Sequence, residues 1–371
     1  MTGKRVRQIC EHGQAIWLDY IHRDLLRSGE LRELIREGLT GMTSNPTIFQ
    51  KAIASGADYD GQIRELAREG LDANAIYETL AVQDIGDAAD QLRNVYNETQ
   101  ARDGFVSIEV SPALAHDAQA TVAEARRLFA RLNRPNVMIK VPATEAGLPA
   151  IRTLIGEGIN VNATLIFSVA MYERVAQAYL DGLRQLQADG RPLRFVSGVA
   201  SFFVSRVDTL VDKLLNERIA AGEHRLEPLR GHAAVANARI AYQRFREIFE
   251  GERFATLRAA GAHVQRPLWA STSTKNPEYP DTKYVDALIG PNTVNTLPPE
   301  TLAAARDHAH VARTIDLDVE DSFTMIERLQ SAGIDMKAVT DQLLVEGVQA
   351  FAASFEKLLA ETEAKRARYA R

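Results

Sequence analysis

The segment NVMIKVP at residues 136–142 is a short β-rich run in which apolar side chains fall on one face of an extended strand and Lys140 falls on the other. A stretch with helical periodicity, DAQATVAEARRLFARL, precedes it at 117–132. Further β-rich runs stand on both sides, FVSIEV at 105–110 and NVNATLIF at 160–167. Strands separated by helices in this way predict βαβ units with parallel strands.

The same alternation extends along most of the chain and gives eight β-rich segments. Helical segments lie between them, for example at 169–186 and 207–219. Eight such units predict an α/β fold, a (β/α)8 TIM barrel. The predicted strands are AIWLDYI (15–21), LTGMTSN (39–45), FVSIEV (105–110), NVMIKVP (136–142), NVNATLIF (160–167), RFVSGVAS (194–201), RPLWASTS (266–273) and NTVNTLP (292–298).

The length of 371 residues allows one large barrel or two average domains. We expect a single barrel domain over 1–371, with its strands at about 15–298. The gaps between the second and third strands, and between the sixth and seventh, have room for additional helices in these loops. The pattern of 299–371 predicts a C-terminal helical extension packed on the barrel.

The composition is that of an ordinary globular protein, with 46% hydrophobic and 25% charged residues. A formal net charge of -5 gives nucleic acid no general reason to bind. A phosphorylated ligand would therefore need a local cluster of Lys or Arg. No run reaches membrane-spanning length and no signal-peptide pattern opens the chain, so we expect no membrane partner.

The single cysteine, Cys10, excludes an intramolecular disulfide framework and a Cys-rich zinc site. This indicates a reducing compartment, and we expect a cytoplasmic protein. The eight histidines are dispersed, and the spacing of His308 and His310 does not aim both at one metal. We therefore expect no metal. We also expect no cofactor. The sequence does not predict the oligomeric state, because amphipathic helices occur both in the packing of a single chain and at subunit interfaces.

Polar residues alternate with apolar ones along strands that should be buried on both faces. Lys140 stands on one such strand, and Asp19 and Glu109 stand on two others. Burying these ions costs several kcal/mol for each unpaired one, so they either form a structural network or perform chemistry. All three lie near the C-terminal ends of their strands, where barrel enzymes assemble their sites, and this favours a catalytic function.

The polar residues belong to motifs that together resemble those of transaldolase. The similarity runs in order from the first strand through the seventh and covers most of the chain, and no single motif carries it. The motifs are LDY with Asp19, TSNPTIF with Thr43 and Asn45, SIEV with Ser107 and Glu109, MIKVPATEAG with Lys140, GINVNATLIFS with Asn162 and Thr164, SFFVSRVD with Ser201, Phe203 and Arg206, and ASTSTKN with Lys275.

The resemblance implies class I aldol chemistry with a Schiff base on Lys140. It implies transfer of a dihydroxyacetone unit from sedoheptulose 7-phosphate to glyceraldehyde 3-phosphate, giving erythrose 4-phosphate and fructose 6-phosphate, in the non-oxidative pentose phosphate pathway. Burial against apolar walls favours the neutral, nucleophilic amine. Asp19 would move the proton of the C4 hydroxyl, and Glu109 with Thr164 and a water would shuttle protons during imine formation and hydrolysis.

The resemblance also implies a set of substrate contacts. Asn45, Asn162 and Ser201 would hold hydroxyls of the three-carbon unit, and Arg206 and Lys275 would clamp the phosphate. The family often has arginine where Lys275 stands, and lysine offers a point charge in place of a planar fork. The full set of expected substrate-binding residues is Thr43, Asn45, Ser107, Asn162, Ser201, Phe203, Arg206 and Lys275.

Three alternatives remain open. Fructose 6-phosphate aldolases of the same superfamily are much shorter and typically have Gln where Glu109 stands and Tyr where Phe203 stands, so both positions favour transfer. A phosphosugar isomerase barrel would not require the lysine of the fourth strand. A catalytically silent barrel would have no use for the lysine, both carboxylates and the threonine.

The stretch after Glu109 and the helical extension resemble the longer bacterial form of transaldolase.

Overall fold

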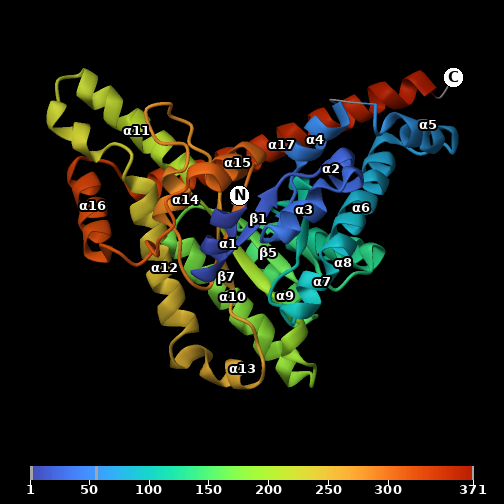
Figure 1. Ribbon diagram of the computed structural model, residues 1–371, viewed down its shortest axis with the longest axis horizontal. Helices are drawn as coiled ribbons and strands as arrows, with labels where there is room; N and C mark the ends of the chain where they lie inside the picture. Colours follow the sequence, from blue (N-terminus) through green and yellow to red (C-terminus); the bar gives the residue numbers. More distant parts are fainter. Residues whose placement is uncertain (1–2, 55–56, 370–371) are drawn as a thin grey trace.

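The computed structural model describes residues 3–54 and 57–369, and within them eight parallel strands close into a barrel in sequence order (Figure 1). The predicted α/β class and (β/α)8 barrel are confirmed. The outermost residues of the predicted domain, 1–2 and 370–371, lie outside the described residues. The strands are β1 (Gln14–Asp19), β2 (Leu39–Thr43), β3 (Val106–Glu109), β4 (Val137–Pro142), β5 (Val161–Ile166), β6 (Gly198–Phe203), β7 (Arg266–Ala270) and β8 (Thr293–Leu297).

The prediction for the sixth strand, 194–201, was wrong at both ends. The chain first closes a 3-10 turn, η2 (Leu193–Phe195), in which the amide of Val196 donates to the carbonyl of Leu193 at 3.1 Å. Phe195 is 51% exposed, and an exposed side chain does not fit a strand that is covered on both faces. The strand therefore begins at Gly198 and extends to Phe203.

Helices follow the strands and cover the outside of the barrel (Figure 1). The predicted helical segments at 117–132, 169–186 and 207–219 correspond to α8, α10 and α11, and the two long gaps hold the additional helices that we expected. The helices are α1 (Lys4–Glu11), α2 (Arg23–Ser28), α3 (Glu30–Arg36), α4 (Pro46–Ala54), α5 (Asp60–Arg68), α6 (Ala73–Gln91), α7 (Arg93–Glu98), α8 (Ala118–Leu132), α9 (Gly147–Gly156), α10 (Val169–Ala188), α11 (Ser205–Ala220), α12 (Ala233–Phe249), α13 (Ala255–Ala259), α14 (Lys283–Ala287), α15 (Pro299–His308), α16 (Val319–Ser331) and α17 (Met336–Tyr369), with short 3-10 turns η1 (Pro112–Leu114), η3 (His224–Leu229) and η4 (Glu252–Phe254).

Local sequence signals explain where individual helices begin and end. In α8, the side chain of Asp117 accepts a hydrogen bond from the amide of Ala120 at 2.9 Å and so caps the first turn. Asn133 ends the helix in the left-handed conformation, with φ 47°. Val122 and Leu128 lie on the buried face between these caps, and this face packs on the barrel.

The C-terminal extension consists of α15, α16 and α17. Figure 1 shows α17 as the long red helix that passes α4 and α5 and ends at the C-terminus. It contacts α6 and β5, and also α4, η1 and α11, which directly follow the carboxyl ends of β2, β3 and β6. This helix therefore crosses the end of the barrel at which the polar residues gather. None of the helices in the described ranges is long and apolar enough to cross a membrane.

Candidate active site

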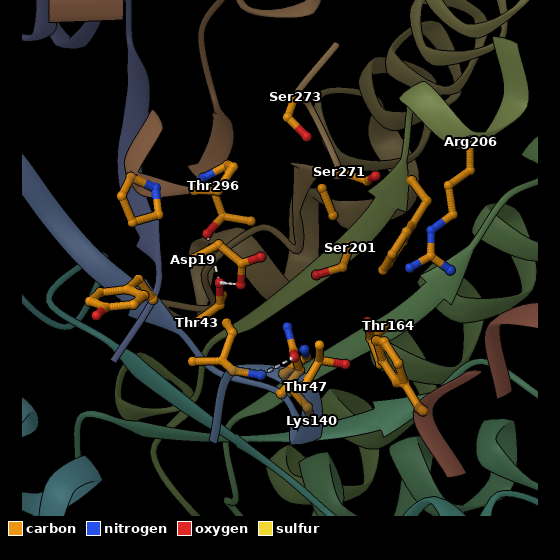
Figure 2. A pocket seen from close by; sticks show the side chains of 18 of the residues that line it. Asp19, Thr43, Thr47, Lys140, Thr164, Ser201, Arg206, Ser271, Ser273 and Thr296 are labelled. Atoms are coloured by element: carbon orange, nitrogen blue, oxygen red, sulfur yellow. Dashed lines mark hydrogen bonds between the residues drawn. The ribbon is translucent and has the colours of Figure 1, made fainter. Parts of the chain in front are cut away.

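A cavity of about 410 Å³ opens at the carboxyl ends of the strands (Figure 2). It is lined by residues of β1, β2, β4, β5, β6, β7 and β8 and of the helices and loops that follow them. Three predicted residues, Ser107, Glu109 and Asn162, do not line it and lie buried behind its wall. The predicted residues that do line it are Asp19, Thr43, Asn45, Lys140, Thr164, Ser201, Phe203, Arg206 and Lys275.

Lys140 projects from β4 into this cavity and is 4% exposed. Its Nζ atom lies 3.2 Å from Oε2 of Glu109 and donates a hydrogen bond to the backbone carbonyl of Ser44 at 3.0 Å. Glu109 and Lys140 are register partners on the neighbouring strands β3 and β4, so the strand pairing itself brings the two side chains together. The amine is thus held among few partners, one of which is a carboxylate able to take its proton.

Glu109 is buried, and this burial raises the pKa of its carboxyl group above the ordinary value, although the charge of Lys140 acts in the opposite direction. Its Oε1 atom has no hydrogen-bond partner among the described residues. The side chain also lines a second, smaller hollow of about 240 Å³, together with Tyr77 of α6 and Phe355 of α17. The Lys140–Glu109 pair therefore lies in the wall between two cavities.

Asp19 stands at the end of β1 on another side of the same cavity. Its Oδ1 atom accepts a hydrogen bond from the hydroxyl of Thr43 at 2.6 Å, and Thr43 lies 2.7 Å from the hydroxyl of Thr296 on β8 (Figure 2). Burial is the main cause that raises the pKa of Asp19, while Lys140 and Thr43 lower it. The two carboxylates thus approach the lysine from different strands and have different partners.

A line of side-chain hydrogen bonds connects three strands beneath the cavity. The hydroxyl of Ser201 donates to Oδ1 of Asn162 at 2.6 Å, and Nδ2 of Asn162 donates to the hydroxyl of Ser107 at 3.1 Å. Asn162 is the register partner of Lys140 on β5, so this polar line runs directly beside the lysine. The hydroxyl of Thr164 is buried and has no hydrogen-bond partner among the described residues.

Backbone strain accompanies Thr164. The next residue, Leu165, adopts φ 61°, a left-handed conformation that is rare for a bulky side chain. The pairing of β5 with β6 is interrupted at this point, between Ala163 and Ile166. Such strain persists only where the surrounding structure holds it, and it concentrates at functional sites.

Two of the motifs are explained by how a strand passes into a helix. In TSNPTIF, the side chain of Asn45 accepts a hydrogen bond from the amide of Ile48 at 3.0 Å, and Pro46 begins α4. In MIKVPATEAG, a Cβ atom at Gly147 would lie 1.9 Å from the carbonyl oxygen of Pro142, so only glycine fits. Asn45 therefore combines a capping role with a place on the cavity wall.

Three cations besides Lys140 line the cavity, namely Lys51, Arg206 and Lys275, and the last two are those that the sequence predicted. Arg206, in the first turn of α11, lies over the ring of Phe203 at 5.2 Å, and burial lowers its pKa from the ordinary value. Lys275 lies in the loop after β7 and donates to the hydroxyl of Ser273 at 2.7 Å. The cluster of Lys or Arg that a phosphorylated ligand needs is thus present locally.

Several cavity residues are absent from the sequence-based prediction. Ser271, Ser273 and Thr296 stand in or next to predicted strands as alternating polar residues, and that signal could have found them. Phe351 carries no such signal, because it belongs to α17 and reaches the cavity only through tertiary packing. The further lining residues are Tyr20, Thr47, Ile48, Lys51, Ala270, Ser271, Ser273, Thr296, Pro298, Pro299, Glu300 and Phe351.

The chain is similar to known proteins over nearly its whole length. The family model described as Transaldolase/Fructose-6-phosphate aldolase matches residues 16–362. "Transaldolase 2" of a Nostoc species is 48% identical over 98% of both chains. "Transaldolase" of Saccharopolyspora erythraea is 48% identical over 96% of both, and "Transaldolase" of Thermobifida fusca is 49% identical over 96% of this chain and 97% of the relative. With this extent of similarity and this barrel, the chain belongs to the transaldolase/fructose-6-phosphate aldolase family.

Proposed function

We propose that this chain is a transaldolase that carries a dihydroxyacetone unit on Lys140 as a Schiff base. Its donor is sedoheptulose 7-phosphate or fructose 6-phosphate, and its acceptor is glyceraldehyde 3-phosphate or erythrose 4-phosphate. The observation that supports the proposal most directly is the position of the Lys140 amine, 3.2 Å from Glu109 and in the same cavity as Asp19. A cavity of about 410 Å³ is within the range of small-molecule sites, roughly 300–1,000 Å³.

Imine formation begins with a proton transfer inside the Lys140–Glu109 pair. Burial raises the pKa of Glu109 and so makes this carboxylate a better proton acceptor than an exposed one, and the transfer leaves the amine free to attack. The amine nitrogen attacks C2 of the ketose, and the C2–O bond then breaks with loss of water. Glu109 returns its proton to the departing oxygen. Thr164, whose hydroxyl is buried beside the site, orients the water in this step and in the later hydrolysis.

Carbon–carbon cleavage depends on Asp19. The protonated imine withdraws the electron pair of the C3–C4 bond while Asp19 takes the proton of the C4 hydroxyl, and an aldehyde leaves. The enamine that remains on Lys140 adds to the carbonyl of the second aldehyde, and Asp19 gives its proton to the new hydroxyl. Hydrolysis of the new imine by one water molecule restores the amine and releases the product ketose.

Substrate contacts follow from the polar wall of the cavity. The side chains of Thr43, Asn45 and Ser201 hold hydroxyls of the three-carbon unit, and Asn162 and Ser107, behind the wall, hold Ser201 in position. The guanidinium of Arg206 lies over the ring of Phe203, and Arg206 binds the phosphate together with Lys275. No metal or cofactor takes part in this scheme. The single cysteine suits a reducing compartment, and we place the activity in the cytoplasm.

Trapping of the intermediate tests the proposal. After reduction with borohydride in the presence of fructose 6-phosphate, mass spectrometry should find a three-carbon adduct on Lys140, and Lys140→Ala should lose both the adduct and sugar exchange. An isomerase would give no such adduct. A silent barrel would give neither adduct nor exchange. An aldolase would release dihydroxyacetone at the rate at which the donor is cleaved, so the ratio of transfer to release separates this last alternative.

A further inference from the structure

An aromatic side chain from the C-terminal helix faces the proposed Schiff-base lysine. Phe351 of α17 is 5% exposed and lines the same cavity as Lys140. The centre of its ring lies 5.8 Å from the Nζ atom. The strand residues around Lys140 are largely polar, so Phe351 gives this part of the cavity an apolar wall.

Contacts on both sides of Phe351 fix its position. Toward the C-terminus, the hydroxyl of Thr47 on α4 donates to that of Ser354 at 2.8 Å, and Gln50 donates to Glu361 at 2.9 Å. One turn toward the N-terminus, α17 presses against the end of β5.

Gly347 makes this close approach possible. A Cβ atom at position 347 would lie 3.0 Å from Cδ2 of Leu165, the strained residue that follows Thr164. The helix α17 therefore packs against the end of β5 that contains Thr164, and Phe351 points from α17 into the cavity.

We infer that Phe351 determines the reaction specificity of the site by keeping water other than the one that Thr164 holds away from the enamine on Lys140. This inference rests on the proposed function. Between the departure of the first aldehyde and the arrival of the second, the enamine carbon can be protonated instead of adding to an aldehyde. Hydrolysis of the resulting imine by one water molecule then releases free dihydroxyacetone and restores the amine. An apolar ring beside the nitrogen disfavours this loss, because it offers water no hydrogen bond.

Three variants separate this role from a general role in packing. Phe351→Ala removes the ring, and Phe351→Leu restores an apolar side chain of smaller size. Leu358→Ala is the matched control, because Leu358 is a fully buried residue of the same helix that does not line the cavity. The Leu358→Ala variant weakens the packing of α17 on the core and keeps the ring of Phe351.

The measurement is the ratio of free dihydroxyacetone to transferred product, determined in one incubation with fructose 6-phosphate and erythrose 4-phosphate. The ratio does not depend on how much of the protein is active. We expect it to rise roughly tenfold or more in Phe351→Ala, equivalent to about 1.4 kcal/mol of relative barrier. Phe351→Leu should show a smaller rise, and Leu358→Ala should keep the ratio of the unmodified chain.

An unchanged ratio in Phe351→Ala, or an equal rise in Leu358→Ala, would overturn the inference. If Phe351→Ala does not fold, as judged by circular dichroism, the comparison of Phe351→Leu with Leu358→Ala decides it. Failure of the proposed function is a different result, because the unmodified chain would then form no adduct on Lys140 and transfer no sugar.

Discussion

The Nζ atom of Lys140 lies 3.2 Å from Oε2 of Glu109, and the two residues are paired in register across β3 and β4. The amine faces the large cavity, whereas the carboxylate lines the hollow behind it. This arrangement lets Glu109 exchange a proton with the lysine without occupying the space that the sugar needs. Parallel pairing of two barrel strands is enough to create it, since register partners project to the same side.

Replacement of Glu109 should affect imine chemistry. In Glu109→Gln we expect kcat to fall by about 10²- to 10⁴-fold, the range for loss of a general acid or base. Borohydride trapping should slow in parallel, because imine formation loses its proton acceptor. Glu124→Gln is the control, because Glu124 lines the same hollow but pairs with the amide of Ser111. Trapping at an unaltered rate in Glu109→Gln would contradict this role.

Asp19 gives a prediction about stability and pH. The folded state raises the pKa of Asp19 and so binds its proton more tightly than the unfolded state. The favourable contribution is therefore fully present below the ordinary pKa of 3.8 and is lost as the pH rises through the raised value. At neutral pH the buried charge costs stability. Asp19→Asn should then raise Tm by about 1–3 °C at pH 7 and give little gain in acid, while kcat falls roughly 10²-fold or more.

Thermal unfolding at several pH values, followed by circular dichroism, measures this effect. Asp24→Asn serves as the control, since Asp24 is exposed in the first turn of α2 and does not line the cavity. A lower Tm for Asp19→Asn at neutral pH would show that the ionised carboxylate stabilises the fold.

The two cations of the cavity that we assign to the phosphate, Arg206 and Lys275, should distinguish phosphorylated from unphosphorylated sugars. Loss of a charge-assisted hydrogen bond costs about 1.5–3 kcal/mol, so Arg206→Ala should raise KM for fructose 6-phosphate roughly 10- to 150-fold. Lys275→Ala should act in the same direction, and Lys275→Arg should retain or improve binding because its planar fork suits a phosphate. Initial rates with fructose 6-phosphate and with fructose provide the measurement.

Lys213→Ala is the matched control for these variants, because Lys213 is an exposed cation of α11 that does not line the cavity. An equal loss for fructose and fructose 6-phosphate would mean that Arg206 acts through packing on Phe203 and not through the phosphate.

The barrel and much of its polar interior could be predicted from the sequence, because alternation along a strand is a local property. Residues two apart share a face, so the side chains of Lys140 and Glu109 had to point away from the apolar faces of their strands. The start of β6 could not be predicted in this way. The run at 194–201 has the composition of a strand, but its first residues close a turn that leaves Phe195 exposed.

The sequence by itself determined which strands form, which of their faces are polar and many of the polar residues that gather at the carboxyl end of the barrel. Only the tertiary structure decided which side chains become partners, such as Thr43 with Thr296, and that Phe351 of a distant helix completes the wall beside Lys140. The physical reason is the distance along the sequence between the residues that interact. Periodicity is set by neighbouring residues, whereas the path of α17 depends on contacts with α4, α6 and β5 that no local pattern records.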